Sequence, residues 1–177
     1  VFDQEHKVVL AVAALLNENS GGRVYLGVLE IKTKYVNKLK TVVIDKFDAI
    51  ELEGKKNLLL GVDNELKLRK KGWDSDIMSN IIMETLKNSI DKRVAKYIDI
   101  NPRIVKDKTV LEISICQNSF YEHGWWIDTE KGKTLPVREG NAVDKKVPPE
   151  ALEWLKDKNQ MVQAEKDRIE LLLSESR

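Results

Sequence analysis

The stretch over residues 8–28, VVLAVAALLNENSGGRVYLGV, constrains the fold more than any other part of the chain. It opens with an unbroken apolar run to Leu16, and alanine and leucine at this density favour a helix that is buried on most sides. Gly21-Gly22 then supplies the positive-φ conformations that a tight helix-to-strand turn needs. β-branched and aromatic residues follow over 23–28, which is typical of a central strand. We therefore predict a buried helix that turns into a core strand, and its carboxyl end at Glu30 is a natural place for a site.

The composition is that of an ordinary folded protein. Apolar residues make up 42% of the 177 residues and charged residues 33%, and the net charge is +1. A dedicated nucleic-acid binder is strongly basic, so any such binding here must come from local clustering of charge. The apolar run over 8–16 is too short for a membrane span, which needs ~20 residues, and we expect no membrane partner. The single cysteine, Cys116, excludes an internal disulfide and fits the reducing cytoplasm, where we expect the protein to work.

The rest of the chain alternates short strands with helices. Residues 77–90 place their apolar side chains on one face of a helix, which Asp74 or Asp76 can cap. Residues 97–105 and 109–116 flank a polar turn and predict a β-hairpin. Further strands are predicted at 41–44, 58–62, 126–127 and 134–138, and a closing helix begins at Pro149. These elements predict an α/β (α+β) fold, with a mostly antiparallel mixed sheet, two packing helices and a C-terminal helix.

Three segments resemble the Schlafen/AlbA_2 family in their order and spacing. They are AALLNENSGGRVYLGVLE at 13–30, LLLGVDNE at 58–65, and LPVREGN at 135–141 followed by VPPEAL at 147–152. They are similar to the family's buried helix with its Gly-Gly turn and Gly-Val strand, its returning strand, and its final strand with an Arg-x-Gly-Asn/Ser turn before the closing helix. The resemblance implies a nucleic-acid-binding module for DNA or RNA, such as a transcriptional regulator, within a longer prokaryotic or viral protein.

The resemblance also implies a domain organisation. We expect a Schlafen/AlbA_2-like domain over 1–158, in which 31–57 is an insertion where the family has a short turn. Residues 159–177 are expected to be a charged helical tail or a linker to a further domain. The segment 159–177 has scattered apolar residues, which suggest that it packs against a partner. This partner is either another domain of a longer chain or a second copy in a homo-oligomer through the C-terminal helix.

The chain departs from the family at its N-terminus. In ribonuclease members, two metal-binding glutamates come from a leading segment that is missing here, and Glu5 is a poor substitute for it. A third carboxylate follows the Gly-Val strand at the position of Glu30. The resemblance thus leaves a metal-dependent endoribonuclease, with Mg²⁺ or Mn²⁺ as cofactor and Glu30 as metal ligand, as an alternative. We expect this chain alone to be inactive, because Mg²⁺ prefers several oxygen ligands and Glu30 supplies at most two.

The acidic candidates for catalysis are Glu30, Asp63 and Glu65. Converging carboxylates can hold a divalent ion and stabilise phosphoryl transfer, but only if the two strand ends are neighbours. The alternative is that all three are solvated loop carboxylates.

Basic residues cluster in one third of the chain, with Tyr35 and Trp73 between them. This pattern suits phosphate contacts and base stacking, although a solvated surface explains it equally well. Arg138 either contacts a phosphate or orders the glycine turn that follows it. A protein-interaction or assembly domain that binds no nucleic acid is the remaining alternative. The nucleic-acid-binding candidates are Lys32, Lys34, Lys67, Arg69, Lys70, Lys71 and Arg138.

Overall fold

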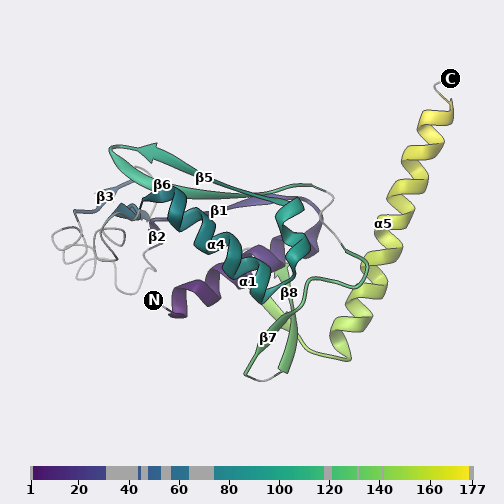
Figure 1. Ribbon diagram of the computed structural model, residues 1–177. Coiled ribbons are helices and arrows are strands. Elements are labelled where there is room, and N and C mark those ends of the chain that lie inside the picture. The colour runs from purple at the N-terminus through teal and green to yellow at the C-terminus, as the bar shows by residue number, and fades with distance from the viewer. Residues whose placement is uncertain are drawn as a thin grey trace. The chain divides into compact units, whose positions relative to one another are not determined.

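The computed structural model describes residues 2–30, 44, 48–52, 57–63, 74–117, 121–130, 132–140 and 142–175 (Figure 1). The described residues form helices and small antiparallel sheets, which confirms the mixed α+β class. The strands of these described ranges form three three-stranded sheets and not one continuous sheet. The chain divides into two compact units: Val1–Gly21, Ser89–Asp91 and Gln117–Arg177 form the first, and Gly22–Asn88 and Lys92–Cys116 form the second.

The first unit begins with helix α1 (Phe2–Glu18), which packs along strand β8 (Gly132–Glu139). Val12, Ala13 and Leu16 are fully buried, so the prediction of a buried helix in this region is confirmed. The helix begins at Phe2, well before the apolar run, and its first turns carry polar residues that the run does not include.

The sheet of the first unit has the order β7-β8-β9, with β7 over Ile127–Thr129 and β9 over Ala142–Lys146. Its central strand β8 contains Pro136, which has no N–H to donate. Pro136 lies opposite Lys145 of β9, whereas β7 pairs with β8 only as far as Thr134, so Pro136 has no partner residue in β7. Strand β9 was not predicted, since its sequence AVDKK has neither alternating polarity nor many β-branched residues.

Helix α5 (Glu150–Glu175) closes the first unit (Figure 1). Its Ala151 and Leu155 pack with Leu135 and Val137 of β8 in a small hydrophobic core. Asn159 Nδ2 donates a hydrogen bond to the Glu122 carbonyl at 3.0 Å. The helix runs without a break across residue 158 to its end.

The larger sheet of the second unit has the order β1-β6-β5, and β5 (Ile98–Val105) and β6 (Lys108–Ile115) form the predicted hairpin. Lys106 and Asp107 make its two-residue turn, both with positive φ, 46° and 61°. Among the described residues, strand β1 (Gly22–Leu26) pairs with β6 alone, so it is the edge strand of this sheet and not the central strand that was expected. Its alternating polar residues are those of an edge strand with one face exposed.

The second sheet of this unit has the order β2-β4-β3, with β2 over Val28–Glu30, β3 over Ile50–Glu51 and β4 over Asn57–Leu59. The buried residues Ala49 and Leu58 form its core. Part of the segment 31–57 therefore belongs to this sheet, while most of the strand predicted at 41–44 lies outside the described residues.

Helix α4 (Ser75–Ser89) is the amphipathic helix that the sequence predicts. Asp74 is its cap: Asp74 Oδ1 accepts the backbone N–H groups of Asp76 at 3.0 Å and Ile77 at 2.9 Å. A short 3-10 helix, η2 (Lys92–Lys96), leads from it to β5. None of the helices in the described part of the chain is both long enough and apolar enough to cross a membrane.

Candidate nucleic-acid interface

Of the three acidic candidates, the structure describes only the Asp63 side chain. Glu30 ends β2, where its backbone pairs with Asn57, but its side chain is not among those described, and Glu65 lies outside the described residues. Asp63 Oδ2 accepts the Thr109 backbone N–H at 2.8 Å, and Asp63 Oδ1 accepts the Thr109 hydroxyl at 2.6 Å. Both oxygens therefore contact the start of β6, and Asp63 has a structural role in this position.

Partial burial raises the pKa of Asp63, but the hydrogen bonds from Thr109 outweigh it and hold that pKa below its ordinary value. Asp63 is thus a charged carboxylate with both oxygens occupied. Within the described ranges, no group of three His, Cys, Asp or Glu side chains could hold a metal ion. Among the described residues, Asp63 alone therefore does not make the carboxylate set that a Mg²⁺- or Mn²⁺-dependent ribonuclease needs.

Most of the basic candidates also fall outside the description. Arg138 is described, and its Nε donates to the Gly140 carbonyl at 3.0 Å. This bond lies in the turn between β8 and β9. Of the two roles considered for Arg138, ordering this turn is therefore the one that an observed contact supports. The candidates outside the described residues are Lys32, Lys34, Lys67, Arg69, Lys70 and Lys71.

A surface that the sequence did not single out lies on the β1-β6-β5 sheet. Residues opposite one another in an antiparallel pair project from the same side of the sheet. The register therefore places seven polar side chains on one side, which we call the polar face: Arg23, Tyr25, Asp99, Asn101, Arg103, Glu112 and Ser114.

Three cross-strand rows make up the polar face. Arg23, Ser114 and Asp99 form the first row. Tyr25, Glu112 and Asn101 form the second, and Arg103 lies in the third, opposite Val110. The row of Tyr25 thus lies between the rows of the two arginines.

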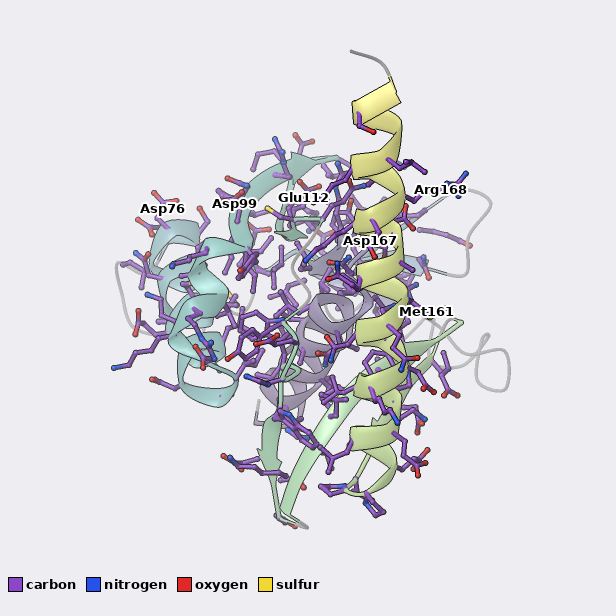
Figure 2. All side chains as sticks on the ribbon, turned by 90° about the vertical axis from the view of Figure 1, so that its right-hand side faces the viewer. Asp76, Asp99, Glu112, Met161, Asp167 and Arg168 are labelled. Carbon is purple, nitrogen blue, oxygen red and sulfur yellow. The ribbon has the colours of Figure 1, made fainter. Side chains whose placement is uncertain are left out.

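Glu112, which is labelled in Figure 2, lies on β6 in the middle row of the polar face. Its Oε1 accepts a hydrogen bond from Arg103 Nη2 at 3.2 Å and one from the Ser114 hydroxyl at 3.4 Å, and Tyr25 also hydrogen-bonds to it. Loss of solvent raises the pKa of Glu112, but the bonds from Arg103 and Tyr25 and the charge of Arg23 outweigh this and lower it. Glu112 is therefore ionised and holds Arg103 and Tyr25 by charge-assisted bonds.

The polar face combines the groups that contact nucleic acids without needing a metal. The Tyr25 side chain is 45% exposed, and the Arg103 side chain is 59% exposed. Exposed aromatic rings stack on bases, and guanidinium groups bind phosphates. Sequence reasoning missed these residues because a polar residue at every second strand position signals only a solvent-facing side. The signal that could have found them is the Arg-x-Tyr spacing in β1 together with Arg103 in the hairpin.

Comparison with protein families, with curated proteins and with solved structures gives no match to this chain.

Proposed function

We propose that this chain is a nucleic-acid-binding module of the Schlafen/AlbA_2 type. The observation that carries the proposal is the polar face, where an exposed Tyr25 ring lies between Arg23 and Arg103 on an open three-stranded sheet. A stacking ring with cations on both sides is the usual composition of a surface that binds nucleic acids with little sequence preference.

Contacts between the motifs that carry the family resemblance support this proposal. In the first unit, Asn17 of the first motif donates from Nδ2 to the carbonyl of Pro136, in the third motif, at 2.7 Å. In the second unit, the Gly27 carbonyl accepts the N–H groups of Leu60 at 2.9 Å and Gly61 at 3.0 Å, which joins the first motif to the second. Motifs that are far apart in sequence thus meet within each unit, as expected if each belongs to one inherited fold.

The proposal is tested by fluorescence anisotropy with labelled single-stranded and double-stranded oligonucleotides over a range of salt concentrations. The affinity should fall steeply with salt, because phosphate contacts release counterions. Replacing Arg23 and Arg103 with Ala should reduce the slope of log K against log salt by about 1 for each phosphate that the variant no longer binds. The matched control is Arg168→Ala on α5, an exposed arginine outside the sheet, which should leave the slope unchanged.

The basic residues outside the described part of the chain enter the same test. Reversing Lys67, Arg69, Lys70 and Lys71 to Glu should abolish most binding if this cluster contributes phosphate contacts. A wild-type chain that binds no oligonucleotide at low salt would contradict the proposal.

A metal-dependent ribonuclease is the alternative within the same family. We expect residues 1–177 not to cleave RNA with Mg²⁺ or Mn²⁺, because Mg²⁺ prefers several oxygen ligands and Glu30 supplies at most two, while both oxygens of Asp63 accept hydrogen bonds from Thr109. The measurement is cleavage of a labelled RNA with and without EDTA. EDTA-sensitive cleavage by this chain that is lost in Glu30→Gln would favour the ribonuclease.

An assembly role is the second candidate, and the distal part of α5 favours it. Three apolar side chains in this part of the helix are exposed: Met161 (70%), Leu171 (59%) and Ile169. The labels of Met161, Asp167 and Arg168 show where this part lies (Figure 2). A helical segment as short as the part of α5 from Met161 to Glu175 is only marginally stable in water without packing contacts, so a partner would stabilise it. Light scattering after size exclusion tests the idea: an assembly through α5 would be lost in Met161→Glu/Ile169→Glu, whereas a monomer at all concentrations would exclude self-assembly.

A further inference from the structure

We propose that the polar face binds single-stranded nucleic acid, with a base stacked on Tyr25 and phosphates bound by Arg23 and Arg103, and that Glu112 competes with the phosphates for Arg103. This inference rests on the proposed function and specifies both its ligand and a contact that limits its affinity.

The position of Tyr25 favours a single strand over a duplex. The ring lies on the exposed side of an edge strand, in the same row as Glu112 and Asn101. A base can stack on such a ring only if its own faces are not already covered by neighbouring bases, as they are in a duplex. The side-chain amide of Asn101 in this row offers both a donor and an acceptor to the edge of a stacked base.

The arginines lie where a backbone that crosses the sheet would pass. Arg23 is on β1 and Arg103 on β5, the two outer strands, and their rows lie on opposite sides of the Tyr25 row. Neighbouring strands are about 4.8 Å apart and a strand rises about 3.3 Å per residue, so the backbone positions of the two arginines, two strands and four residues apart, are separated by about 16 Å. Two long, flexible arginine side chains that start from these positions can reach phosphates on either side of a base stacked on Tyr25.

Two carboxylates, Asp99 and Glu112, also lie on the polar face, and Glu112 is the one that binds Arg103. It lies on the central strand, its side chain is 12% exposed, and Arg103 Nη2 contacts its Oε1 at 3.2 Å. A phosphate must take Arg103 from this carboxylate and also lies close to its negative charge, which opposes binding. A merely solvated sheet surface has no such competition, so removing the Glu112 charge separates the two interpretations.

The decisive variants are Glu112→Gln and Tyr25→Thr, measured by anisotropy with a labelled oligothymidine and a duplex of equal length. Glu112→Gln keeps the shape and removes the charge, and it should tighten single-strand binding about 3- to 10-fold. Its control is Asp167→Asn on α5, the same change of net charge in the other unit, which should alter affinity less than about 2-fold. Tyr25→Thr keeps a strand-forming residue but removes the ring, and should weaken single-strand binding about 10-fold with little effect on the duplex.

Tyr25→Phe supplies the complementary control, because it keeps the ring and should bind within about 3-fold of wild type. If wild type binds oligothymidine and both Tyr25→Thr and Glu112→Gln bind it with the same affinity, this inference is overturned and the proposed function stands. Absence of binding in both wild type and Glu112→Gln would overturn both. If Tyr25→Thr does not fold, Glu112→Gln against Asp167→Asn still decides the matter. Equal affinity for polyglutamate and for oligothymidine would instead assign the polar face to acidic protein partners.

Discussion

At the scale of single residues, Asn17 is a buried polar side chain that links separate segments of the first unit. It is fully buried, and its amide makes three hydrogen bonds: Nδ2 donates to the carbonyls of Trp125 at 3.1 Å and Pro136 at 2.7 Å, and Oδ1 accepts the Trp125 N–H at 2.8 Å. The pairing of β7 with β8 ends at Thr134, and beyond this point the Asn17 amide bridges the backbones of Trp125 and Pro136. It thereby satisfies backbone groups of these two residues that would otherwise be buried without partners.

Asn17→Ala should therefore lower the free energy of unfolding by about 2–4 kcal/mol, because it leaves buried backbone groups of Trp125 and Pro136 unsatisfied. The measurement is urea unfolding followed by tryptophan fluorescence. Asn159→Ala is the matched control: its amide makes one exposed bond to Glu122, and the loss should be less than about 1 kcal/mol. Equal stability of the two variants would show that Asn17 does not have this role.

Lys146 connects three parts of the first unit by charge. Its ammonium group lies 3.2 Å from Glu139, 3.0 Å from Asp144 and 3.0 Å from Glu150, so it joins β8, β9 and the start of α5. The hydrogen bonds that Lys146 donates to Asp144 and Glu150 raise the pKa of Lys146, despite the opposing effect of burial. Lys146→Gln should cost about 1–3 kcal/mol, since it leaves three carboxylates close together without a cation. Lys145→Gln, an exposed neighbour on β9, should change stability by less than about 0.5 kcal/mol.

The stabilisation by Lys146 should depend on pH in a defined window. The hydrogen bond from Lys146 is the main cause that lowers the pKa of Asp144, so this contribution is present above the unfolded pKa of about 3.9 and is lost as the pH falls through the folded value. The raised pKa of Lys146 gives the opposite limit: its contribution is complete below the unfolded value of about 10.4 and is lost at higher pH. The difference in Tm between wild type and Lys146→Gln should be constant from pH 5 to 9, about the range between these limits, and shrink below pH 4. A difference that is still constant at pH 3, about one unit below the unfolded Asp value, would contradict this account.

At the scale of elements, the second unit depends on a close contact between two glycines. A Cβ at Gly27, where φ is 96°, would lie 3.0 Å from backbone atoms of Gly61, and a Cβ at Gly61, where φ is 70°, would lie 2.6 Å from Asp63 Oδ2. The crossing of these two segments sets the start of β2 and the end of β4. It also explains why the strands form separate small sheets, because a positive φ interrupts a regular strand.

Gly27→Ala should lower the free energy of unfolding by more than about 2 kcal/mol, because the backbone strain and the collision with Gly61 act together. Gly140→Ala tests the strain alone, since φ is 61° there and nothing lies within 4 Å of the added Cβ. That control should cost only about 1 kcal/mol. Thermal melting of the two variants makes the comparison, and a Gly27→Ala chain as stable as Gly140→Ala would remove the steric part of the explanation.

Elements with a strong local pattern could be predicted from the sequence, and those fixed by distant contacts could not. The apolar run of α1, the capped helix α4 and the β5–β6 hairpin each carry their own periodicity and turn residues. Strand β9 and the edge position of β1 depend instead on which strand lies alongside. The same distinction holds for the candidate site: Arg138 could be located by its turn, but the row that joins Tyr25 to Glu112 exists only once the register of β1 on β6 is known.

At the scale of the whole molecule, the two units contain different features. The first contains the Asn17 amide, the Lys146 charge cluster and α5, which together stabilise that unit. The second contains the polar face and the glycine crossing that positions its neighbouring strands. If nucleic-acid binding belongs to the polar face, a ligand should therefore affect the second unit and leave the backbone of the first nearly unchanged.

The most direct test of this central claim is a ¹⁵N–¹H correlation spectrum of the labelled chain, recorded during titration with an unlabelled oligothymidine. We expect the largest chemical-shift changes at the backbone amides of Tyr25, Arg103 and Glu112. The affinity obtained from the titration should fall as the salt concentration increases. The amides of Arg138 and Lys146 in the first unit should move little, which makes them the internal reference. Shift changes confined to the first unit, or none at any concentration of oligonucleotide, would contradict the account.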